Sequence, residues 1–375
     1  MLTWWATAPY REVEQALAEY RQRLSDDGAA PRSPRTIVGR PIGWDALLVG
    51  LAGEVTACTP EELADIARRE LWWCEREMVR ASRELGFRDD WHPALECVKN
   101  VCGPPGAQPP VTDELAAESV QFAEAHHLVT IPALAQEAWR TAMMTPDRQR
   151  INLFVLGGEV IQISCPTDTM SYEEPMMSLR GNNRYFSRST VFHELLPGHC
   201  LQQYMTASHQ THRQLLRSAF WVEGLAFYWE MRYWELGFNE RAEQRIGMLS
   251  WRMHHSARRI YTLGFHLGQM TADEAVALLI ERVGHEPDHA CGEVRHLFEG
   301  GYGPLCQCAY LIGALQFRAL HRELAVQRGM AERAFHDAIL QQGRMPIDIL
   351  RAVLKGVRLP LAVLRGHRRP GGPPA

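Results

Sequence analysis

The chain has 375 residues, enough for one large domain or two domains of ordinary size. Its 46% of hydrophobic and 22% of charged residues are typical of a globular protein, and its formal net charge of −4 gives no electrostatic reason to expect nucleic acid as a partner. The sequence holds no run of about 18 apolar residues and no basic segment followed by an apolar one at its start, so it predicts neither a membrane span nor a secretory signal.

Helical signals dominate the N-terminal part of the chain. The stretch T59-P-E-E62 is a capping box, in which Thr59 caps a helix and Glu62 reaches back to it. This helix is expected to end at about Leu85, because Gly86 follows. Other helices are expected over residues 10–24 and 112–126. We therefore predict a helical N-terminal part over residues 1–145.

One segment has the pattern of β-structure. The run N152-L-F-V-L-G-G-E-V-I-Q-I-S164 is rich in β-branched residues and contains a Gly-Gly pair that suits a turn. We expect a small hairpin or edge sheet here, set in a helical protein. Such an edge could pair with an extended peptide.

The stretch S189-T-V-F-H-E-L-L-P-G-H-C-L-Q202 has an unusual histidine spacing. It contains a His-Glu pair of the kind that zinc peptidases carry on a helix, but the position four residues after His193, where the second ligand usually falls, is Pro197. The next histidine, His199, is six residues on, which places the two imidazoles about 120° apart around a straight helix. The Pro-Gly pair between them breaks a helix, and we expect the break to bring His199 back onto the face of His193.

The sequence downstream of this stretch is again helical. A second capping box, T271-A-D-E274, precedes an apolar run, and the tail from residue 366 is too rich in Gly and Pro to pack. Further helices are expected over residues 220–236, 239–267 and 306–328. The pattern predicts a mainly α protein with a small sheet beside the helix of His193. A metal-binding, catalytic part over residues 146–360 would form one compact unit with the N-terminal part, followed by a flexible tail over residues 361–375.

The stretch F220-W-V-E-G-L-A-F-Y-W-E230 offers the third protein ligand that a catalytic zinc needs. Glu223 and Glu230 lie seven residues apart, near one face of an aromatic helix. An unpaired carboxylate is costly in such surroundings, so both are expected to face a cation or its ligands. Glu223 as a metal ligand and Glu230 as the partner of a ligating histidine satisfy this demand.

Together, H193-E-L-L-P-G-H199 and the stretch from Phe220 to Glu230 resemble the bacterial family called domain of unknown function 885, or DUF885. Further matching stretches are Pro166-Thr167-Asp168-Thr169-Met170, R180-G-N-N-R184, residues 257–266, and Y302-G-P-L with A309-Y-L-I-G313. The resemblance covers roughly residues 41–354 and implies a largely helical zinc metallopeptidase of the gluzincin type, in which the H-E-x-x-P-G-H motif binds one zinc ion per chain.

The resemblance implies roles for four of these residues. His193 and His199 would bind zinc, and Glu223 would complete the ligand set. Glu194 would be the general base, because it adjoins a ligand and so would reach a water that the metal activates without binding the metal itself.

A developing oxyanion also needs a hydrogen-bond donor besides the metal. Tyr302 and Tyr310 could each supply a phenol and His266 an imidazole, and the alternative for each is a packed core residue. Arg258 could bind a substrate carboxylate through its forked guanidinium, or it could make an internal salt bridge. The loop before the metal helix offers further donors to a substrate, namely Arg180, Asn182 and Asn183.

Three functions stay open from the sequence. The leading expectation is a zinc hydrolase that cleaves a peptide or a small amide, and the second is a zinc enzyme that carries out elimination, hydration or ring opening on a small metabolite. The third is a non-catalytic helical binding protein. The nine cysteines include no C-x-x-C pair, which favours reduced thiols and a cytoplasmic location, and the eleven tryptophans could contribute to a homodimer interface.

Overall fold

The computed structural model describes residues 3–27, 37, 39–56, 58–104, 106–145, 160–163, 179–216, 218–298 and 303–358. The chain forms two compact units, residues 1–38 and residues 39–375. The smaller unit contains one long helix, α1 (Thr3–Asp27), which includes the helix predicted over residues 10–24.

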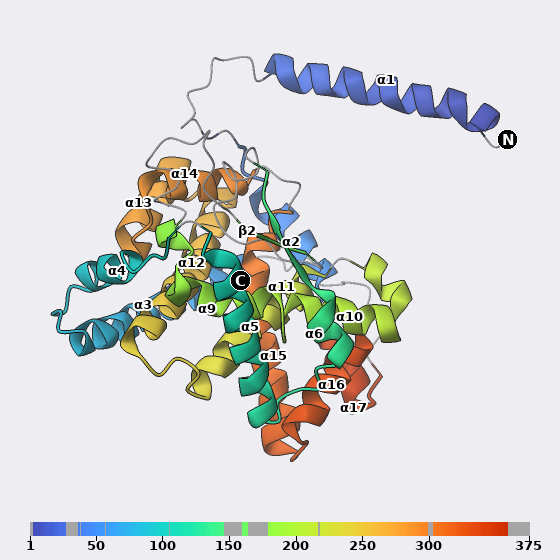
Figure 1. Cartoon of the computed structure of the whole chain (residues 1–375). Helices are drawn as coiled ribbons and strands as arrows, with labels where there is room; N and C mark the ends of the chain where they lie inside the picture. The colour runs from blue at the N-terminus through green and yellow to red at the C-terminus, as the bar shows by residue number, and fades with distance from the viewer. Residues whose placement is uncertain are drawn as a thin grey trace, which may run out of the picture. The chain divides into compact units, whose positions relative to one another are not determined.

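The larger unit is built mainly from helices, as Figure 1 shows. They are α2 (Gly43–Gly53), α3 (Pro60–Glu84), α4 (His92–Lys99), α5 (Gln108–Ala125), α6 (Ala133–Ala138), α9 (Arg184–Glu194), α10 (His199–His209), α11 (Ala219–Glu235), α12 (Ala242–His266), α13 (Ala272–Val283), α14 (Pro287–His296), α15 (Cys306–His321), α16 (Glu332–Gln342) and α17 (Ile347–Lys355). A 3₁₀ turn, η1 (Thr211–Leu215), and a π-helical turn, η2 (Arg322–Gln327), join them. The predicted mainly α fold is confirmed.

Both predicted capping boxes are present. The hydroxyl of Thr59 accepts a hydrogen bond from the backbone N–H of Glu62 at 3.3 Å, and the Glu62 carboxylate accepts one from the backbone N–H of Thr59 at 2.7 Å. Thr271 and Glu274 repeat this pair of bonds at the start of α13. These side chains satisfy backbone donors that the first helical turn leaves unpaired, so the start of each helix could be predicted from the sequence.

Six helices in the described part of the larger unit were not predicted: α2, α4, α6, α14, α16 and α17. None of these six has a side chain that caps its first turn through a hydrogen bond, so each lacks the strongest local signal of a helix start. The helix predicted over residues 306–328 is regular only up to His321 and continues as η2.

The described part of the chain contains a small sheet of two parallel strands, β1 (Arg140–Met143) and β2 (Val160–Ile163). Arg140 lies opposite Val160, and Met143 lies opposite Ile163. β2 falls within the predicted β-segment, whereas β1 was not predicted, because all four of its residues are exposed and give no alternating pattern. The Gly-Gly turn of the expected hairpin lies outside the described residues.

Helix packing at the centre of the larger unit joins distant parts of the sequence. α12 packs along α3 and α9, and residues 39–145 of the expected N-terminal part belong to the same compact unit as residues 146–360, whereas residues 1–38 form the other unit. α11 and α15 cross at two glycines: a Cβ atom on Gly224 would lie 2.4 Å from Cα of Gly313, and one on Gly313 would lie 2.1 Å from the carbonyl oxygen of Phe220. The two backbones are therefore in direct contact.

Within the part of the chain that the structure describes, no helix combines the length and the apolar character needed to cross a membrane.

The crossing of α11 and α15 leads to a prediction about stability. Gly224→Ala is expected to lower the free energy of unfolding by about 1–3 kcal/mol, because the added methyl group meets backbone atoms that cannot rotate away. Urea unfolding followed by circular dichroism measures the change. Gly292→Ala in α14 is the matched control, since nothing lies within 4 Å of its added Cβ. Equal stability of the two variants would contradict the close crossing.

Candidate metal centre

The H-E-x-x-P-G-H stretch is divided between two helices. α9 ends at Glu194 and α10 begins at His199. Between them, the N–H of Gly198 donates to the carbonyl oxygen of Phe192 at 3.0 Å, and a Cβ atom on Gly198 would lie only 1.8 Å from the carbonyl oxygen of His193. The chain turns at a position that has room for glycine alone. The helix break lies where the sequence predicts it, and the ring centres of the two histidines are 4.9 Å apart.

Three ligand atoms from three helices converge at this break. Oε2 of Glu223, on α11, lies 3.3 Å from Nε2 of His199 and 3.7 Å from Nε2 of His193. Ligands that surround a zinc ion tetrahedrally at about 2.0–2.1 Å lie about 3.3 Å from one another. The distances from Glu223 to the two imidazoles are close to this value, and two imidazoles with one carboxylate are a donor set that suits zinc.

The other nitrogen of each imidazole is held by a second partner. Nδ1–H of His193 donates to Oε1 of Glu230 at 2.7 Å. Nδ1–H of His199 donates to Oε1 of Gln202 at 3.3 Å, and the Gln202 amide in turn donates to the carbonyl oxygen of Val222. In neutral rings, both Nε2 atoms are then acceptors that point towards Glu223. Two lone pairs and a carboxylate that face one another require a proton or a metal cation between them.

The pKa shifts in the site also show that a positive charge between these groups is stabilised. Burial alone would lower the pKa of His193, but its bonds to Glu223 and Glu230 outweigh burial and raise this pKa to about 10. Burial opposes the ionisation of Glu223, yet the two histidines hold the pKa of its carboxyl well below the usual range. Glu223 is thus a charged group that is ready to bind a cation.

A second carboxylate, Glu194, also lies at the centre. One ligand atom from each of His193, Glu194 and His199 lies within 4.8 Å of the other two, so Glu194 competes with Glu223 for the role of third ligand. Of the two carboxylates, Glu223 is the one whose Oε2 contacts both imidazoles and whose carboxyl has a lowered pKa. Burial raises the pKa of Glu194, which suits a group that accepts a proton.

Two further rings lie near His193. Tyr310, on α15, has its ring centre 5.9 Å from that of His193, with an angle of 18° between the planes. His255, on α12, stacks on Tyr310 at 4.5 Å. The guanidinium of Arg258 lies 5.9 Å from the Tyr310 ring centre and pairs with Glu293 at 2.5 and 2.9 Å. Of the two roles expected for Arg258, the structure therefore shows the internal salt bridge, beside the site.

The loop residues expected to contact a substrate have other partners. The Asn183 side chain caps α9 by accepting from the N–H of Tyr185 at 3.0 Å, and it donates to the carbonyl oxygen of Val98 at 2.8 Å. Asn182 is buried, and its backbone oxygen accepts from the Ser187 hydroxyl. These residues fix the start of the helix that carries His193.

The remaining candidates are not brought to the ligands. His266 lies in the last turn of α12, about three turns from His255, and its ring contacts Phe265 and Phe298. Arg180 bonds to Asn100 and Glu96, on and next to α4. Tyr302 lies outside the described residues.

Two residues near the candidate ligands were missed by the sequence analysis. Gln202 lies three residues after His199 on α10, a helical spacing that places neighbouring side chains on one face, and this could have identified it as a partner of His199. His255 gave no local signal, because its contacts with Tyr310 and His193 arise only from the packing of α12 against α9 and α15.

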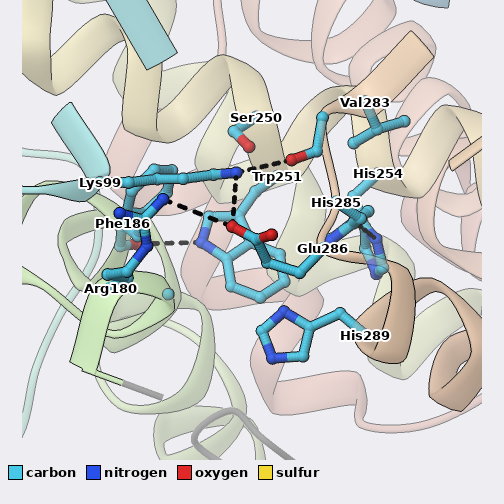
Figure 2. A pocket seen from close by; sticks show the side chains of 12 residues that line it. Lys99, Arg180, Phe186, Ser250, Trp251, His254, Val283, His285, Glu286 and His289 are labelled. Atoms are coloured by element: carbon cyan, nitrogen blue, oxygen red, sulfur yellow. Dashed lines mark hydrogen bonds and ion pairs between the residues drawn. The ribbon is translucent and has the colours of Figure 1, made fainter. Parts of the chain in front are cut away.

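A separate pocket is lined by residues of α4, α9, α12 and the loop between α13 and α14. Figure 2 shows the Glu286 carboxylate between Lys99 and Arg180, at 3.5 and 3.4 Å. On another wall, Nδ1 of His254 lies 2.7 Å from Nε2 of His285. The cationic side chains of this pocket, Lys99 and Arg180, are already paired with protein carboxylates. These ion pairs join α4 to the loop before α14, and among the residues described they leave no unpaired charge for a ligand.

The comparisons with known proteins give a family and a fold. One protein family, described as "Bacterial protein of unknown function (DUF885)", matches residues 5–354. Two solved structures are similar. A "putative lipoprotein of unknown function" from Shewanella oneidensis is 18% identical with a TM-score of 0.75, and the "putative lipoprotein" from Colwellia psychrerythraea is 15% identical with a TM-score of 0.69.

The first similarity covers 92% of this chain and 65% of the Shewanella protein, and the second covers 84% of this chain and 56% of the Colwellia protein. This chain thus spans less than two thirds of the length of either relative. A search of curated proteins finds no match. At these identities the structural similarities show the fold.

The tight turn between α9 and α10 leads to a second prediction. Gly198→Ala is expected to lower the free energy of unfolding by about 3 kcal/mol or more, because the added methyl group overlaps two backbone carbonyl groups. Thermal unfolding monitored by circular dichroism measures the loss. Gly53→Ala, at the end of α2, adds a methyl group with no atom within 4 Å and serves as the control. A Gly198→Ala variant as stable as this control would show that the turn is wider than described.

Proposed function

Because the chain belongs to the bacterial family DUF885, whose function is unknown, we propose its activity from the site itself: a zinc-dependent hydrolase that cleaves a peptide or amide bond. The observation that carries this proposal is the approach of Oε2 of Glu223 to Nε2 of His199 and Nε2 of His193, at 3.3 and 3.7 Å, close to the ligand spacing around zinc. Glu230 and Gln202 support it, because they hold the opposite nitrogen of each imidazole and so orient both rings.

Glu194 would act as the general base. When bound, zinc would supply a Lewis acid that polarises a carbonyl group and acidifies a water molecule. Glu194 directly follows the ligand His193, and burial raises the pKa of its carboxyl, which makes it a stronger base than an exposed glutamate. It would accept a proton from the water that attacks the carbonyl carbon and deliver this proton to the amine nitrogen. The C–N bond then breaks, and the products are a carboxylic acid and an amine.

Tyr310 would bind the carbonyl oxygen of a substrate. Burial raises the pKa of its phenol well above the usual value, so the hydroxyl stays protonated and able to donate. Arg258 lies over its ring and is fixed by Glu293, which limits the movement of both side chains. This pairing also leaves Arg258 poorly suited to capture a substrate carboxylate, so the proposed substrate is an internal peptide bond or an uncharged amide.

The proposal predicts the metal content of the purified protein. About one zinc per chain is expected, and His193→Ala, His199→Ala and Glu223→Ala should each lose it, because a zinc ion held by three protein ligands is bound weakly by two. Elemental mass spectrometry measures the content. His209→Ala, at the exposed end of α10, is the control and should keep its zinc. Wild-type protein that takes up no metal when zinc is supplied would refute the proposal.

The role of Glu194 predicts a separation between metal binding and activity. Glu194→Gln should keep its zinc but lower kcat about 10²–10⁴-fold, because the amide cannot accept the proton of the attacking water. New amine groups, measured with an amine-reactive dye on a mixture of peptides, report the cleavage. The exposed Glu240→Gln is the control. If zinc-loaded wild type leaves peptides and simple amides intact, the hydrolase assignment is wrong even though the metal is present.

A further inference from the structure

Arg344 is a half-buried arginine without a counter-charge. It lies in the turn between α16 and α17 and forms neither an ion pair nor a hydrogen bond with the described residues. Every other described arginine that is not exposed has at least one such partner. A guanidinium stays protonated at neutral pH, and it is costly to withdraw from water unpaired. Arg344 is therefore a cation that a bound anion would neutralise.

The turn that carries Arg344 is fixed against the helix of His199. A Cβ atom on Gly343 would lie 3.4 Å from Cγ2 of Thr206, on α10. Thr206 follows His199 by seven residues, so the two lie about two turns apart on one face of this helix. On the other side of Arg344, Met345 is 5% exposed and belongs to the core. The Arg344 side chain thus starts from an anchored backbone beside the helix that begins with a candidate zinc ligand.

The charge that acts on Arg344 is that of the candidate metal centre. Burial lowers the pKa of its guanidinium, and the carboxylate of Glu223 on α11 opposes this shift. Among the described residues, Glu223 is the only charged group that shifts this pKa. Nε of Arg344 is buried, whereas Nη1 and Nη2 are neither buried nor bonded to a described residue. The terminal N–H donors are therefore free, on a side chain that senses the charge of Glu223.

We propose that Arg344 is a specificity-determining residue, whose guanidinium binds the carboxylate of an aspartate or glutamate side chain beside the peptide bond that is cleaved. This inference rests on the proposed hydrolase function and deepens it, because it names acidic peptides as the substrate class. The guanidinium presents parallel N–H donors that match the two oxygens of a carboxylate. An acidic side chain supplies this group next to an internal peptide bond, which has no terminal charge of its own.

Arg344 is better suited to this role than Arg258. The guanidinium of Arg258 is already bonded to Glu293, so a substrate carboxylate would have to displace a protein carboxylate. Arg344 has no such partner among the described residues, so a substrate carboxylate gains its full charge-assisted hydrogen bonds. Binding at Arg344 also removes the cost of leaving a half-buried cation unpaired.

Small probes test the site independently of cleavage. The monohydroxamates of succinic and glutaric acid join a zinc-binding group to a carboxylate through a short methylene chain, and their controls carry a primary amide in place of the carboxylate. Calorimetry on zinc-loaded protein measures the affinities. The wild type should bind one of the acids about tenfold more tightly than its amide, because hydrogen bonds between charged groups are stronger than neutral ones.

Variants assign this preference to one residue. Arg344→Gln should bind acid and amide equally while keeping its zinc and its Tm, and Arg344→Lys should retain part of the preference, because it keeps the charge but not the fork. Arg322→Gln, which removes an exposed arginine of η2, is the control and should behave as the wild type.

Each outcome decides the proposal. Equal affinity of the wild type for acid and amide at both chain lengths would overturn it, as would a preference that Arg344→Gln keeps. Loss of zinc in both Arg344 variants would also overturn it, because the residue would then support the metal centre instead of the substrate. A wild type that takes up no zinc refutes the proposed function and this inference with it, which is a result distinct from failure at Arg344 alone.

Peptides then distinguish the source of the carboxylate. Replacing a glutamate beside the cleaved bond with glutamine should lower kcat/KM about tenfold in the wild type and leave it unchanged in Arg344→Gln. Amidation of the peptide's C-terminus should have no effect on either protein. Cleavage that depends on the free C-terminus instead of the acidic side chain would show that the assigned substrate class is wrong.

Discussion

The geometry of the candidate site depends on the contact between Gly198 and the carbonyl groups of Phe192 and His193. A straight helix brings ligands together at a spacing of four residues, but here the two histidines are six residues apart. The chain closes this difference by ending α9, turning with almost no space between backbone atoms, and starting α10 at His199. A side chain at Gly198 would hold the two segments apart and separate the imidazoles.

The candidate site also depends on the neutralisation of the buried carboxylates of α11. This helix places Trp221, Phe227 and Trp229 in the core together with the carboxylate of Glu230, so Glu230 and its neighbour on the same face, Glu223, have little access to water. Glu230 is compensated by His193, and Glu223 by both histidines. A buried ion pair costs free energy unless its groups are well hydrogen-bonded. The helices must therefore pack in a way that keeps these side chains in bonding distance of one another. The candidate metal centre and the core are one structure.

Whether a feature of the fold or of the site could be predicted from the sequence depends on how far apart in the sequence the interacting residues lie. Helix starts at Thr59 and Thr271 depend on residues three positions apart, and the approach of His193, Glu223 and Glu230 follows from residue types that are costly to bury alone. The six helices that were not predicted, the exposed strand β1 and the π-helical turn after α15 carry no such local signal. They form because tertiary contacts stabilise them, and these contacts cannot be read from a single sequence.

The same limit explains the partners of individual side chains. The sequence left two roles open for Arg258, and only the approach of α14 decides between them by placing Glu293 beside its guanidinium. His254 and His255 are neighbours in the sequence, but a helix turns by about 100° between them. His254 therefore bonds to His285 in the pocket of Figure 2, whereas His255 stacks on Tyr310 beside the candidate metal centre. α12 thus separates two polar regions of the core, and a histidine on it acquires its chemistry from the neighbouring helix that it faces.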